Sequence, residues 1–532
     1  MRPLRRLSLA LVGLIFLSCG FRLQAFGTDA ARQMQVGIAS VDITPDYPVR
    51  LNGFGMRRQP SEGVRQHLYA RAMAIGTGDE NTAVILTVDT LGIPDDLTER
   101  LALKLSVRGI RREQLAICAS HTHSGPMIRN CANTLFGEPI PDDHWKAIVS
   151  YSDQLERSLE QVALKALDDR RPASVFFGIG QAGFAVNRRT AGGPVDHDVP
   201  VLAIRNSDHS LRAVFVNYAC HCVTLSDNLL SGDWAGYAMD HLQRMYPDCE
   251  ALISIGCGAD ANPRGGVLGS QSDVADQLGL ELAEAVRKVL NGSMTPMTES
   301  LDCQLERVIL PLDSLPTRDE WLDKAKRDDA IGHHARTQLS RLDRGEPLMT
   351  EVSYPVQSIS FGGELSMVFL PGEVVVDYAT RLKGELDRNR LWLHAYSNAC
   401  PGYIPSERIL REGGYEGGAA MVYYDIPTRY QAGIEDKIVR AVIRQIGNRL
   451  KPEQDASRTD GIAPKTPREA LASLQLKPEF SAELVAAEPL IESPVAIAFG
   501  PDGRLWVAEM SDYPQGRPEG DGEHEPGGSI RC

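Results

Sequence analysis

The sequence predicts an α/β protein, with layered mixed β-sheets flanked by helices and a short C-terminal β fragment. Short apolar runs rich in β-branched residues, typical of buried strands, alternate along most of the chain with amphipathic helical stretches. At 532 residues the chain is also too long for one ordinary domain. Such alternation indicates sheets whose faces are covered by helices, in one large domain followed by a smaller unit.

The elements follow one another in a regular order. Strands are expected where apolar and β-branched residues run together, and helices where apolar residues recur every three or four positions. Asn206-Ser207-Asp208 is a turn signal between two strands and predicts a hairpin. The predicted elements are a strand at 83–88, a helix at 97–107, a strand at 115–119, a helix at 145–167, hairpin strands at 199–205 and 211–218, a strand at 251–255, a helix at 271–290, a strand at 365–370 and a helix at 374–386.

The composition changes near residue 450. Residues 451–470 are rich in Pro, Asp, Ser and Lys and are interpreted as a linker. Within residues 471–532, two short strands around Pro501-Asp502-Gly503 predict a hairpin. This part resembles the opening of a β-propeller of the bacterial sugar-dehydrogenase-like type. A single blade cannot close a ring, so the tail is expected to be a truncated propeller or a disordered remnant.

The N-terminus has the pattern of a signal peptide. Arg2, Arg5 and Arg6 precede an apolar run at 7–21, and a small residue, Ala25, suits cleavage after it. We therefore expect residues 1–25 to direct export to the periplasm, cell envelope or extracellular space. The alternatives are lipoprotein processing at Cys19 and an uncleaved N-terminal anchor.

The charge balance excludes some partners. The chain carries 56 basic and 70 acidic residues, a net charge of −14. Nucleic acid is not an expected partner, because phosphate binding needs a cationic face. A peripheral membrane contact through a local apolar patch stays open.

Cys220 and Cys222 flank His221, a spacing that superficially suggests a thiolate metal site. The surrounding run at 215–224 is strand-like, however, and alternate residues of a strand point to opposite faces. The two cysteines are therefore interpreted as structural.

His121 and His123 lie two residues apart just after the predicted strand at 115–119. In an extended segment both imidazoles would lie on one face and could approach one metal ion. The alternative is a pair of polar histidines that cap a strand. His221 and Glu373 also follow predicted strands, and strand ends line the active-site crevice in α/β folds. Zinc accepts imidazole nitrogen and carboxylate oxygen, although Glu373 alone could be a helix N-terminal carboxylate.

Motifs of other hydrolase and nucleotide-binding classes are absent from the sequence, including His-Glu-x-x-His, Gly-x-Ser-x-Gly and Gly-Lys-Ser/Thr. Between about residues 35 and 450 the chain instead resembles the neutral, non-lysosomal ceramidase family. The match rests on several segments in the same order: Val36 to Pro45, Leu51-Asn52-Gly53-Phe54-Gly55, His121-Thr122-His123-Ser124-Gly125-Pro126, Asn187-Arg188, His221 with Asp233-Trp234-Ala235-Gly236-Tyr237, Leu370-Pro371-Gly372-Glu373, Asn398 to Tyr403, and Tyr415-Glu416-Gly417.

The resemblance implies a ceramidase-like zinc hydrolase domain at residues 34–450, acting on a lipid or other small-molecule amide through zinc-activated water. It implies zinc held by four side chains and a group of residues around the reacting amide. The implied zinc ligands are His121, His221, Glu373 and Tyr403. The implied catalytic group contains His123 as proton shuttle, with Arg188 and Tyr415 placed to stabilise the oxyanion or anchor the substrate.

Two departures from the family pattern affect the expected chemistry. The family loop reads Gly-Asp-x-Ser-Pro, whereas Asn262 takes the serine position here. An amide side chain can hydrogen-bond a substrate but cannot act as a nucleophile, which favours a metal-water mechanism over a covalent one. The family's C-terminal immunoglobulin-like domain is also not visible in the sequence. A non-lipid amide, or a ligand-binding role in an envelope redox protein, are therefore the alternative functions.

Overall fold

The computed structural model describes residues 33–78, 81–298, 300–451 and several segments of the C-terminal part, namely 467–474, 480–487, 490–491, 494–510 and 528–531. The chain divides into two compact units, residues 1–452 and residues 453–532. The predicted signal peptide, with Cys19, lies outside the described residues, as does most of the predicted linker at 451–470.

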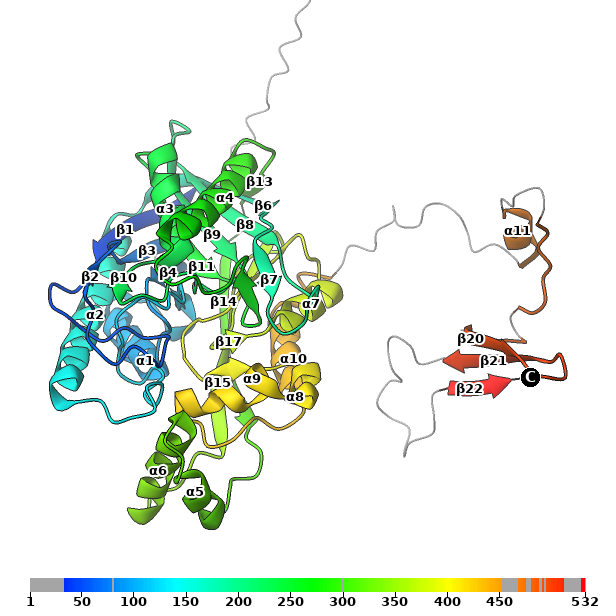
Figure 1. Cartoon of the computed structure of the whole chain (residues 1–532). Helices are drawn as coiled ribbons and strands as arrows, with labels where there is room; N and C mark the ends of the chain where they lie inside the picture. The colour runs from blue at the N-terminus through cyan, green and yellow to red at the C-terminus, as the bar shows by residue number, and fades with distance from the viewer. Residues whose placement is uncertain are drawn as a thin grey trace, which may run out of the picture. The chain divides into compact units, whose positions relative to one another are not determined.

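The first unit is built on a nine-stranded mixed sheet (Figure 1). Its strand order is β11-β9-β8-β6-β1-β3-β4-β5, and β13 pairs with β6. The pairs β4–β5 and β9–β11 are parallel, and the other pairs in this sheet are antiparallel. The strands are β1 (Met34–Asp42), β3 (Tyr69–Gly76), β4 (Thr82–Val88), β5 (Leu115–Ala119), β6 (Arg171–Gln181), β8 (Asp198–Arg205), β9 (Leu211–Tyr218), β11 (Glu250–Ile255) and β13 (Thr295–Met297).

A second, four-stranded sheet packs on one face of the first. It runs in the order β14 (Leu301–Pro311), β15 (Glu351–Phe361), β16 (Leu365–Phe369) and β18 (Leu391–His394). Successive side chains of a strand point to opposite faces, so each sheet divides its apolar residues between two cores. In β3, Met73 and Ile75 join Trp392 in the core between the sheets, whereas Ala72 joins the core on the other face.

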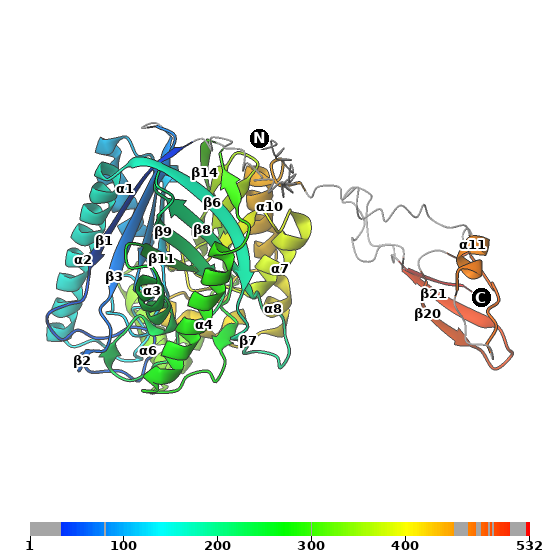
Figure 2. The same cartoon turned by 90° about the horizontal axis from the view of Figure 1, so that it is seen from above.

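Helices cover the outer faces of both sheets (Figure 2). Each helix buries an apolar stripe, as Leu155, Leu159 and Val162 of α2 illustrate. At Gly37 of β1, an added Cβ would lie 1.8 Å from Ala166 O, so glycine permits the close approach of α2. The nine-stranded sheet carries α1 (Asp95–Leu105), α2 (Asp142–Asp168), α3 (Asp233–Met245) and α4 (Ser272–Leu290), and the other sheet carries α7 (Val376–Glu385) and α10 (Ile434–Ile446).

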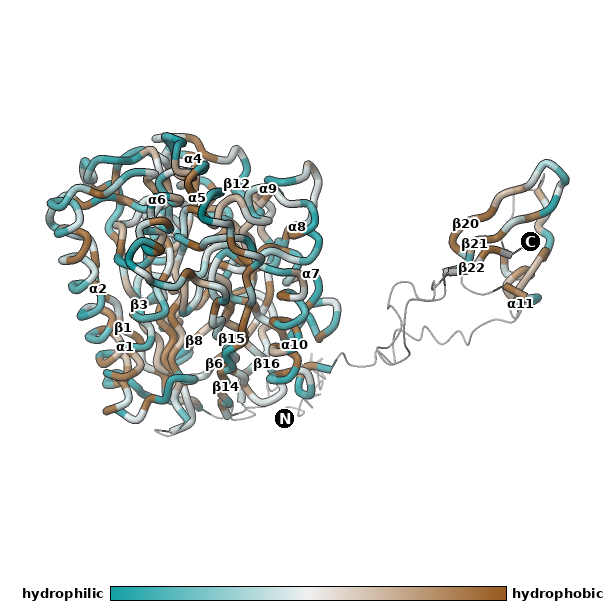
Figure 3. Tube along the Cα trace, turned by 90° about the horizontal axis from the view of Figure 1, so that it is seen from below, coloured by the Kyte–Doolittle hydropathy of each residue, from teal (hydrophilic) through white to brown (hydrophobic). Residues whose placement is uncertain are grey.

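The unit therefore has four layers, helix–sheet–sheet–helix, which confirms the predicted α/β class with mixed sheets. Figure 3 shows the hydrophobic colour concentrated on interior strands such as β3, β8 and β15, while hydrophilic and hydrophobic segments alternate along α2. Among the described residues, no helix combines the length and apolar character needed to span a bilayer.

Short elements at the ends of the main strands shape the remaining surface. Three two-stranded ribbons lie here, and two of them carry candidate site residues, namely Asn262, Glu373 and Tyr403. The ribbons pair β2 (Gly63–Val64) with β10 (Leu229–Leu230), β7 (Ala185–Asn187) with β12 (Ala261–Pro263), and β17 (Glu373–Val374) with β19 (Tyr403–Ile404). The other short elements are the 3-10 helices η1 (Ser106–Arg108), η2 (Arg112–Gln114) and η3 (Ala419–Tyr424), and the helices α5 (Arg318–Lys324), α6 (Ala330–Asp343), α8 (Glu407–Glu412) and α9 (Gly414–Gly417).

Most predicted elements occur within a few residues of their expected ends. Two details were wrong. The strand expected to run through 215–224 ends at Tyr218, so His221 lies in the loop beyond it. The segment after β5 is not extended, because His121 has a left-handed backbone with φ of 53°. Both errors arise where the chain leaves the sheet and local turns override the strand pattern.

The second unit contains α11 (Pro467–Ala472) and a three-stranded antiparallel sheet of β20 (Pro494–Phe499), β21 (Leu505–Met510) and β22 (Gly528–Arg531). The hairpin predicted around Pro501-Asp502-Gly503 is confirmed as β20–β21. The third strand was not predicted. Several large apolar side chains of this unit are exposed, including Ile497 and Phe499.

Candidate functional site

The loop after β5 brings two histidines to one place despite its irregular backbone. His121 is buried and His123 is half-buried, and their Nε2 atoms lie 3.2 Å apart. The ring of Tyr396 stacks on His121 with ring centroids 4.1 Å apart. Gly53 packs against His123: its φ is 90°, and an added Cβ would lie 2.5 Å from His123 Cγ. The glycine in the Asn-Gly-Phe-Gly segment is therefore required by the position of His123.

His221 reaches the same point from the loop after β9. It is fully buried, and its ring centroid lies 4.7 Å from that of His121. Trp234 at the start of α3 donates a hydrogen bond from Nε1 to the His221 carbonyl oxygen at 2.8 Å. The neighbouring Cys220 and Cys222 are buried and belong to the hydrophobic core, and the cluster that could hold a metal ion contains neither.

Glu373 and Tyr403 are register partners in the parallel ribbon β17–β19. Glu373 is buried, and its Oε2 atom lies 3.0 Å from His221 Nε2 and 3.3 Å from His121 Nε2. The hydroxyl group of Tyr424, at the end of η3, donates to Oε1 of the same carboxylate. Glu373 precedes α7 and contacts these groups directly, so it is not a carboxylate that caps the helix.

The hydrogen bonding of His121 and His221 fits a bound cation. His121 Nδ1 lies 2.7 Å from the Leu91 carbonyl oxygen, and His221 Nδ1 lies 3.1 Å from that of Gly258. Each ring thus sits between a carbonyl oxygen and the Glu373 carboxylate, yet a neutral imidazole has only one N–H. Burial, together with Arg188, lowers the pKa of His221 to about 4, so its ring is neutral at pH 7.

A metal ion resolves this arrangement. Metal-bound histidines commonly donate their second N–H to a carbonyl oxygen, which leaves the other nitrogen for the ion. His121, His123 and His221 place one nitrogen each within 4.8 Å of one another and could bind a metal ion. Nitrogen and carboxylate donors of this kind fit zinc well, and Glu373 Oε2, which faces both His121 and His221, supplies the carboxylate oxygen.

Arg188 is positioned by the ribbon β7–β12, which also carries Asn262. Its backbone N–H donates to the Asp260 carbonyl oxygen at 2.8 Å. The Asp260 carboxylate accepts from Asn187 Nδ2 at 3.1 Å and from the backbone N–H of Val376 at 2.8 Å. This buried carboxylate therefore ties the ribbon to the first turn of α7.

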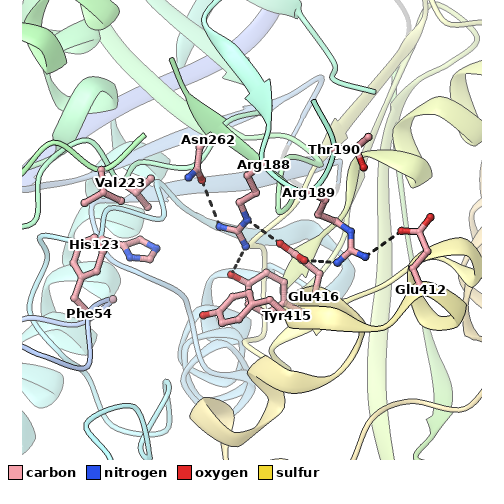
Figure 4. A pocket seen from close by; sticks show the side chains of 13 residues that line it. Phe54, His123, Arg188, Arg189, Thr190, Val223, Asn262, Glu412, Tyr415 and Glu416 are labelled. Atoms are coloured by element: carbon pink, nitrogen blue, oxygen red, sulfur yellow. Dashed lines mark hydrogen bonds and ion pairs between the residues drawn. The ribbon is translucent and has the colours of Figure 1, made fainter. Parts of the chain in front are cut away.

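The Arg188 guanidinium makes several directed contacts. Its Nε atom donates to Glu416 Oε1 at 2.8 Å, and one terminal nitrogen donates to the Tyr403 hydroxyl group at 3.0 Å. The other terminal nitrogen lies 3.4 Å from Asn262 Oδ1. Figure 4 shows this guanidinium on the side of the cavity opposite His123. The ring of Tyr415 lies beside it, with the ring centroid 5.5 Å from the guanidinium carbon.

These side chains line a cavity of about 570 Å³. His123, Arg188, Asn262, Tyr403 and Tyr415 all contribute to its walls, together with a mixed set of charged and apolar side chains. The further lining residues are Gly53, Phe54, Arg189, Thr190, Val223, Val267, Glu412 and Glu416. The cavity thus gives access to the histidine cluster through His123.

Burial sets the ionisation of the groups around the cavity. Burial and the neighbouring His121 and His221 hold the pKa of His123 well below its ordinary value, so this ring is an uncharged proton acceptor at pH 7. Burial raises the pKa of Tyr403 well above its ordinary value. The pKa of Glu373 is held well below its ordinary range by the two facing histidines, although burial opposes them.

The structure brings all eight sequence-predicted site residues to this cavity and the cluster beside it. His121, His221 and Glu373 form the buried part, and the other five line the cavity. Sequence reasoning missed Tyr424, which contacts Glu373, and Tyr396, which stacks on His121. It also missed Arg189, which lines the cavity and donates to Glu416. No motif marks Tyr424, because its role depends on η3 folding back against Glu373.

Comparisons with known proteins agree with the resemblance that the motifs predicted. Residues 34–135 match the profile of the family "Neutral/alkaline non-lysosomal ceramidase, N-terminal". Residues 466–532 match a domain of unknown function, DUF7133. No curated protein is similar to the chain by sequence. The resemblance to the neutral ceramidase family is confirmed by the first match.

Two solved structures have the same fold. One is described as neutral ceramidase from Pseudomonas aeruginosa, with 17% identity, a TM-score of 0.61, and coverage of 91% of this chain and 85% of that chain. The other is described as ceramidase complexed with C2, with 17% identity, a TM-score of 0.60 and the same coverage. At this identity the likeness establishes the fold.

Proposed function

We propose that the chain is an exported zinc-dependent hydrolase that cleaves the amide bond of an N-acyl compound of the ceramide type. The family resemblance and the fold support amide hydrolysis. One observation supports the metal dependence. His121 and His221 each lie between a backbone carbonyl oxygen and Glu373 Oε2, and each neutral ring has only one N–H to donate to these two acceptors. This conflict is relieved when a cation lies between the nitrogens and the carboxylate.

His121, His221, Glu373 and Tyr403 are the residues that would hold the ion. A bound zinc ion supplies Lewis acidity, which polarises a carbonyl group and lowers the pKa of water. Tyr403 is included because the family resemblance implies it. Its backbone pairs in register with Glu373, and its hydroxyl group accepts from Arg188. A substrate in the cavity would thus reach the ion from the side that His123 and Tyr403 line.

His123 is the proposed general base and acid. Its ring is neutral at pH 7, lines the cavity and lies 3.2 Å from the nearest metal-facing nitrogen of His121. It accepts the proton of the attacking water and returns it to the nitrogen of the departing amine. Proton transfer by a positioned side chain of this kind contributes about 10²–10⁴-fold to a rate.

Arg188 and Tyr415 are the proposed donors to the oxygen of the tetrahedral intermediate. The Arg188 guanidinium is held by Glu416, so it does not need to reorganise when charge develops on the substrate. Asn262 lies on the same wall and orients the substrate through its amide group. It cannot serve as a nucleophile, which is consistent with direct attack by water.

The cavity lining bears on the substrate class. Val267 and Tyr415 are 46% and 45% exposed at the cavity, and such apolar surface suits an acyl chain. Arg189, Glu412 and Glu416 also line it and favour a polar group on the same substrate. The second candidate is therefore a zinc hydrolase for a non-lipid amide, with the same residues in the same roles.

Export and a peripheral membrane contact are parts of the proposal that rest on the sequence. The signal-like N-terminus supports export, and an amide with a lipid chain would be reached at a membrane surface. The alternative, a ligand-binding part of an envelope redox protein, is not favoured by the ceramidase resemblance.

Metal content and amide hydrolysis test the proposal together. Purified protein is expected to bind one zinc ion and to hydrolyse N-acylsphingosine or a polar N-acyl amine from a substrate panel. His121→Ala should lose both properties. The matched control is His241→Ala, since His241 pairs with Asp276 and belongs neither to the histidine cluster nor to the cavity lining, so it should keep both. Wild-type protein that binds no zinc and cleaves no amide would sink the proposal.

A further inference from the structure

Two cysteine thiols meet beside the candidate site. The Sγ atoms of Cys131 and Cys400 lie 3.3 Å apart, although the residues are 269 positions apart in the chain. Cys131 is buried and Cys400 is partly exposed. Among the cysteines that the structure describes, no other two sulfur atoms lie within hydrogen-bonding distance of each other.

The contact connects the two loops that present the site. Cys131 lies in the loop that begins with His121 and His123, and its carbonyl oxygen accepts from Asn52 Nδ2 at 3.0 Å. Cys400 lies three residues before Tyr403. The Cys400 loop is paired to the Glu373 segment, where the Glu373 N–H donates to the Gly402 carbonyl oxygen at 2.9 Å.

The two sulfur atoms pack against the same glycine. They lie over the backbone of Gly92, where an added Cβ would be 2.8 Å from Cys400 Sγ and 3.2 Å from Cys131 Sγ. A disulfide has an S–S distance of about 2.04 Å, so the pair needs to close by roughly 1.3 Å from 3.3 Å. Any larger residue at position 92 would occupy the space of these sulfur atoms.

We propose that Cys131 and Cys400 are a disulfide-forming pair, and that the bond links the loop of His121 to the loop of Tyr403. The oxidant is a compound or protein that carries a reactive disulfide. A thiolate at Cys400 attacks one sulfur of the oxidant and releases a thiol. The contact with Cys131 and burial raise the pKa of Cys400, so this step is slow at neutral pH and becomes faster as the pH rises. Cys131 then attacks Cys400 Sγ and releases the second thiol.

The exchange is balanced. One protein disulfide forms, the oxidant's disulfide is reduced to two thiols, and the two protons of the cysteines end on those thiols. An exported protein would meet an oxidising environment in which such bonds persist. The Cys131–Cys400 disulfide would also form in the isolated protein in a disulfide buffer, so the inference does not depend on the proposed hydrolase activity.

Peptide mapping of the wild-type protein tests the bond directly. The folded full-length chain is incubated with oxidised glutathione, alkylated without reduction, and digested with trypsin. Cleavage releases peptides 130–146 and 391–408, and each contains one cysteine. We expect one disulfide-linked species of these two peptides, which separates into both after reduction. Recovery of both peptides alkylated and unlinked, or linked to other cysteines, would overturn the proposal.

Thermal unfolding provides a second readout. A cross-link over so long a loop restricts the unfolded chain, so the oxidised protein should unfold roughly 3–8 °C above the reduced protein. Cys131→Ser and Cys400→Ser should each abolish that difference. The matched control is Cys303→Ser, because Cys303 has intermediate exposure but no sulfur partner among the cysteines that the structure describes, and it should retain the difference. An equal redox shift in Cys131→Ser and wild type would contradict the assignment.

Discussion

The hydroxyl group of Tyr424 donates a hydrogen bond to Oε1 of Glu373, while Oε2 of the same carboxylate faces His121 and His221 at 3.3 and 3.0 Å. The tyrosine therefore fixes which oxygen is available to a metal ion. Its own position depends on the next residue, because Asp425 pairs with Arg341 of α6. The small helical insertion of α5 and α6 thus supports the metal-facing carboxylate through Tyr424.

Replacement of Tyr424 by phenylalanine should weaken metal binding by about 10- to 100-fold, which is the usual effect of losing an outer hydrogen bond to a metal ligand. The reason is that Glu373 becomes free to rotate or to offer both oxygens. Competition with a chromophoric chelator measures the dissociation constant. Tyr423→Phe is the control, since the Tyr423 ring neighbours Tyr415 and should leave metal affinity unchanged. Equal affinities in wild type and Tyr424→Phe would remove Tyr424 from the account.

Arg188→Lys should lower kcat/KM for the amide substrate by about 10²–10³-fold, the range expected when one donor to an oxyanion is lost. Lysine keeps the charge but cannot contact Glu416, Tyr403 and the substrate at once. Steady-state kinetics measure the change, and bound zinc should stay near one equivalent. Arg264→Lys is the control, because Arg264 is exposed and pairs with Glu281. An unchanged kcat/KM in Arg188→Lys would contradict its role.

Asn262→Ala should retain activity within about tenfold of wild type, because losing one hydrogen bond to a substrate costs about 1 kcal/mol. The only described side-chain partner of the Asn262 amide is Arg188, at 3.4 Å. Asn262→Ser restores the family residue and should shift preference among substrates more than it changes the overall rate. A loss beyond a thousandfold in Asn262→Ala would mean that this position does more than orient the substrate.

The buried His394 should make the protein sensitive to acid. Burial between Phe215 and Phe369 lowers its folded-state pKa to about 3 from the ordinary 6.5. Below pH 6.5 the unfolded state therefore binds a proton that the folded state does not. This histidine's contribution to stability is fully present above about pH 6.5 and is lost as the pH falls towards 3.

Urea unfolding of the wild type and of His394→Gln at pH 7 and pH 5 measures this effect. The free energy of unfolding should fall less between these pH values in the variant, by up to about 2 kcal/mol. Glutamine has no titrating group but can still reach Ser254, which lies 2.8 Å from His394 Nδ1. If the two proteins lose the same free energy of unfolding, His394 does not titrate as described.

Much of the fold could be predicted from the sequence, because buried strands such as 115–119 and 83–88 are short runs of mostly apolar or β-branched residues with few other interpretations. The long strands β14 and β15 were not predicted, since polar residues alternate along β14 where it lies at the sheet edge. Periodicity also cannot show that two sheets stack on each other. That arrangement depends on residues such as Met73 and Trp392, which are distant in sequence but belong to the same core between the sheets.

The candidate site, like the fold, could be predicted only in part from the sequence. His121 and His123 were found through a local motif, although the reason given for their convergence, an extended backbone, was wrong at His121. His221 and Glu373 were found because they follow predicted strands, and the remaining candidates came from the family resemblance. Tyr424 and the Cys131–Cys400 contact could not be predicted, because each joins loops that only the folded chain brings together.

Anomalous diffraction at the zinc absorption edge, from crystals grown with zinc, tests the central claim most directly. The account predicts one strong peak about 2.0–2.2 Å from His121 Nε2, His221 Nε2 and a Glu373 carboxylate oxygen, with the Tyr403 hydroxyl group turned towards it. A map with no peak among these side chains, or with zinc bound only elsewhere on the protein, would contradict the account.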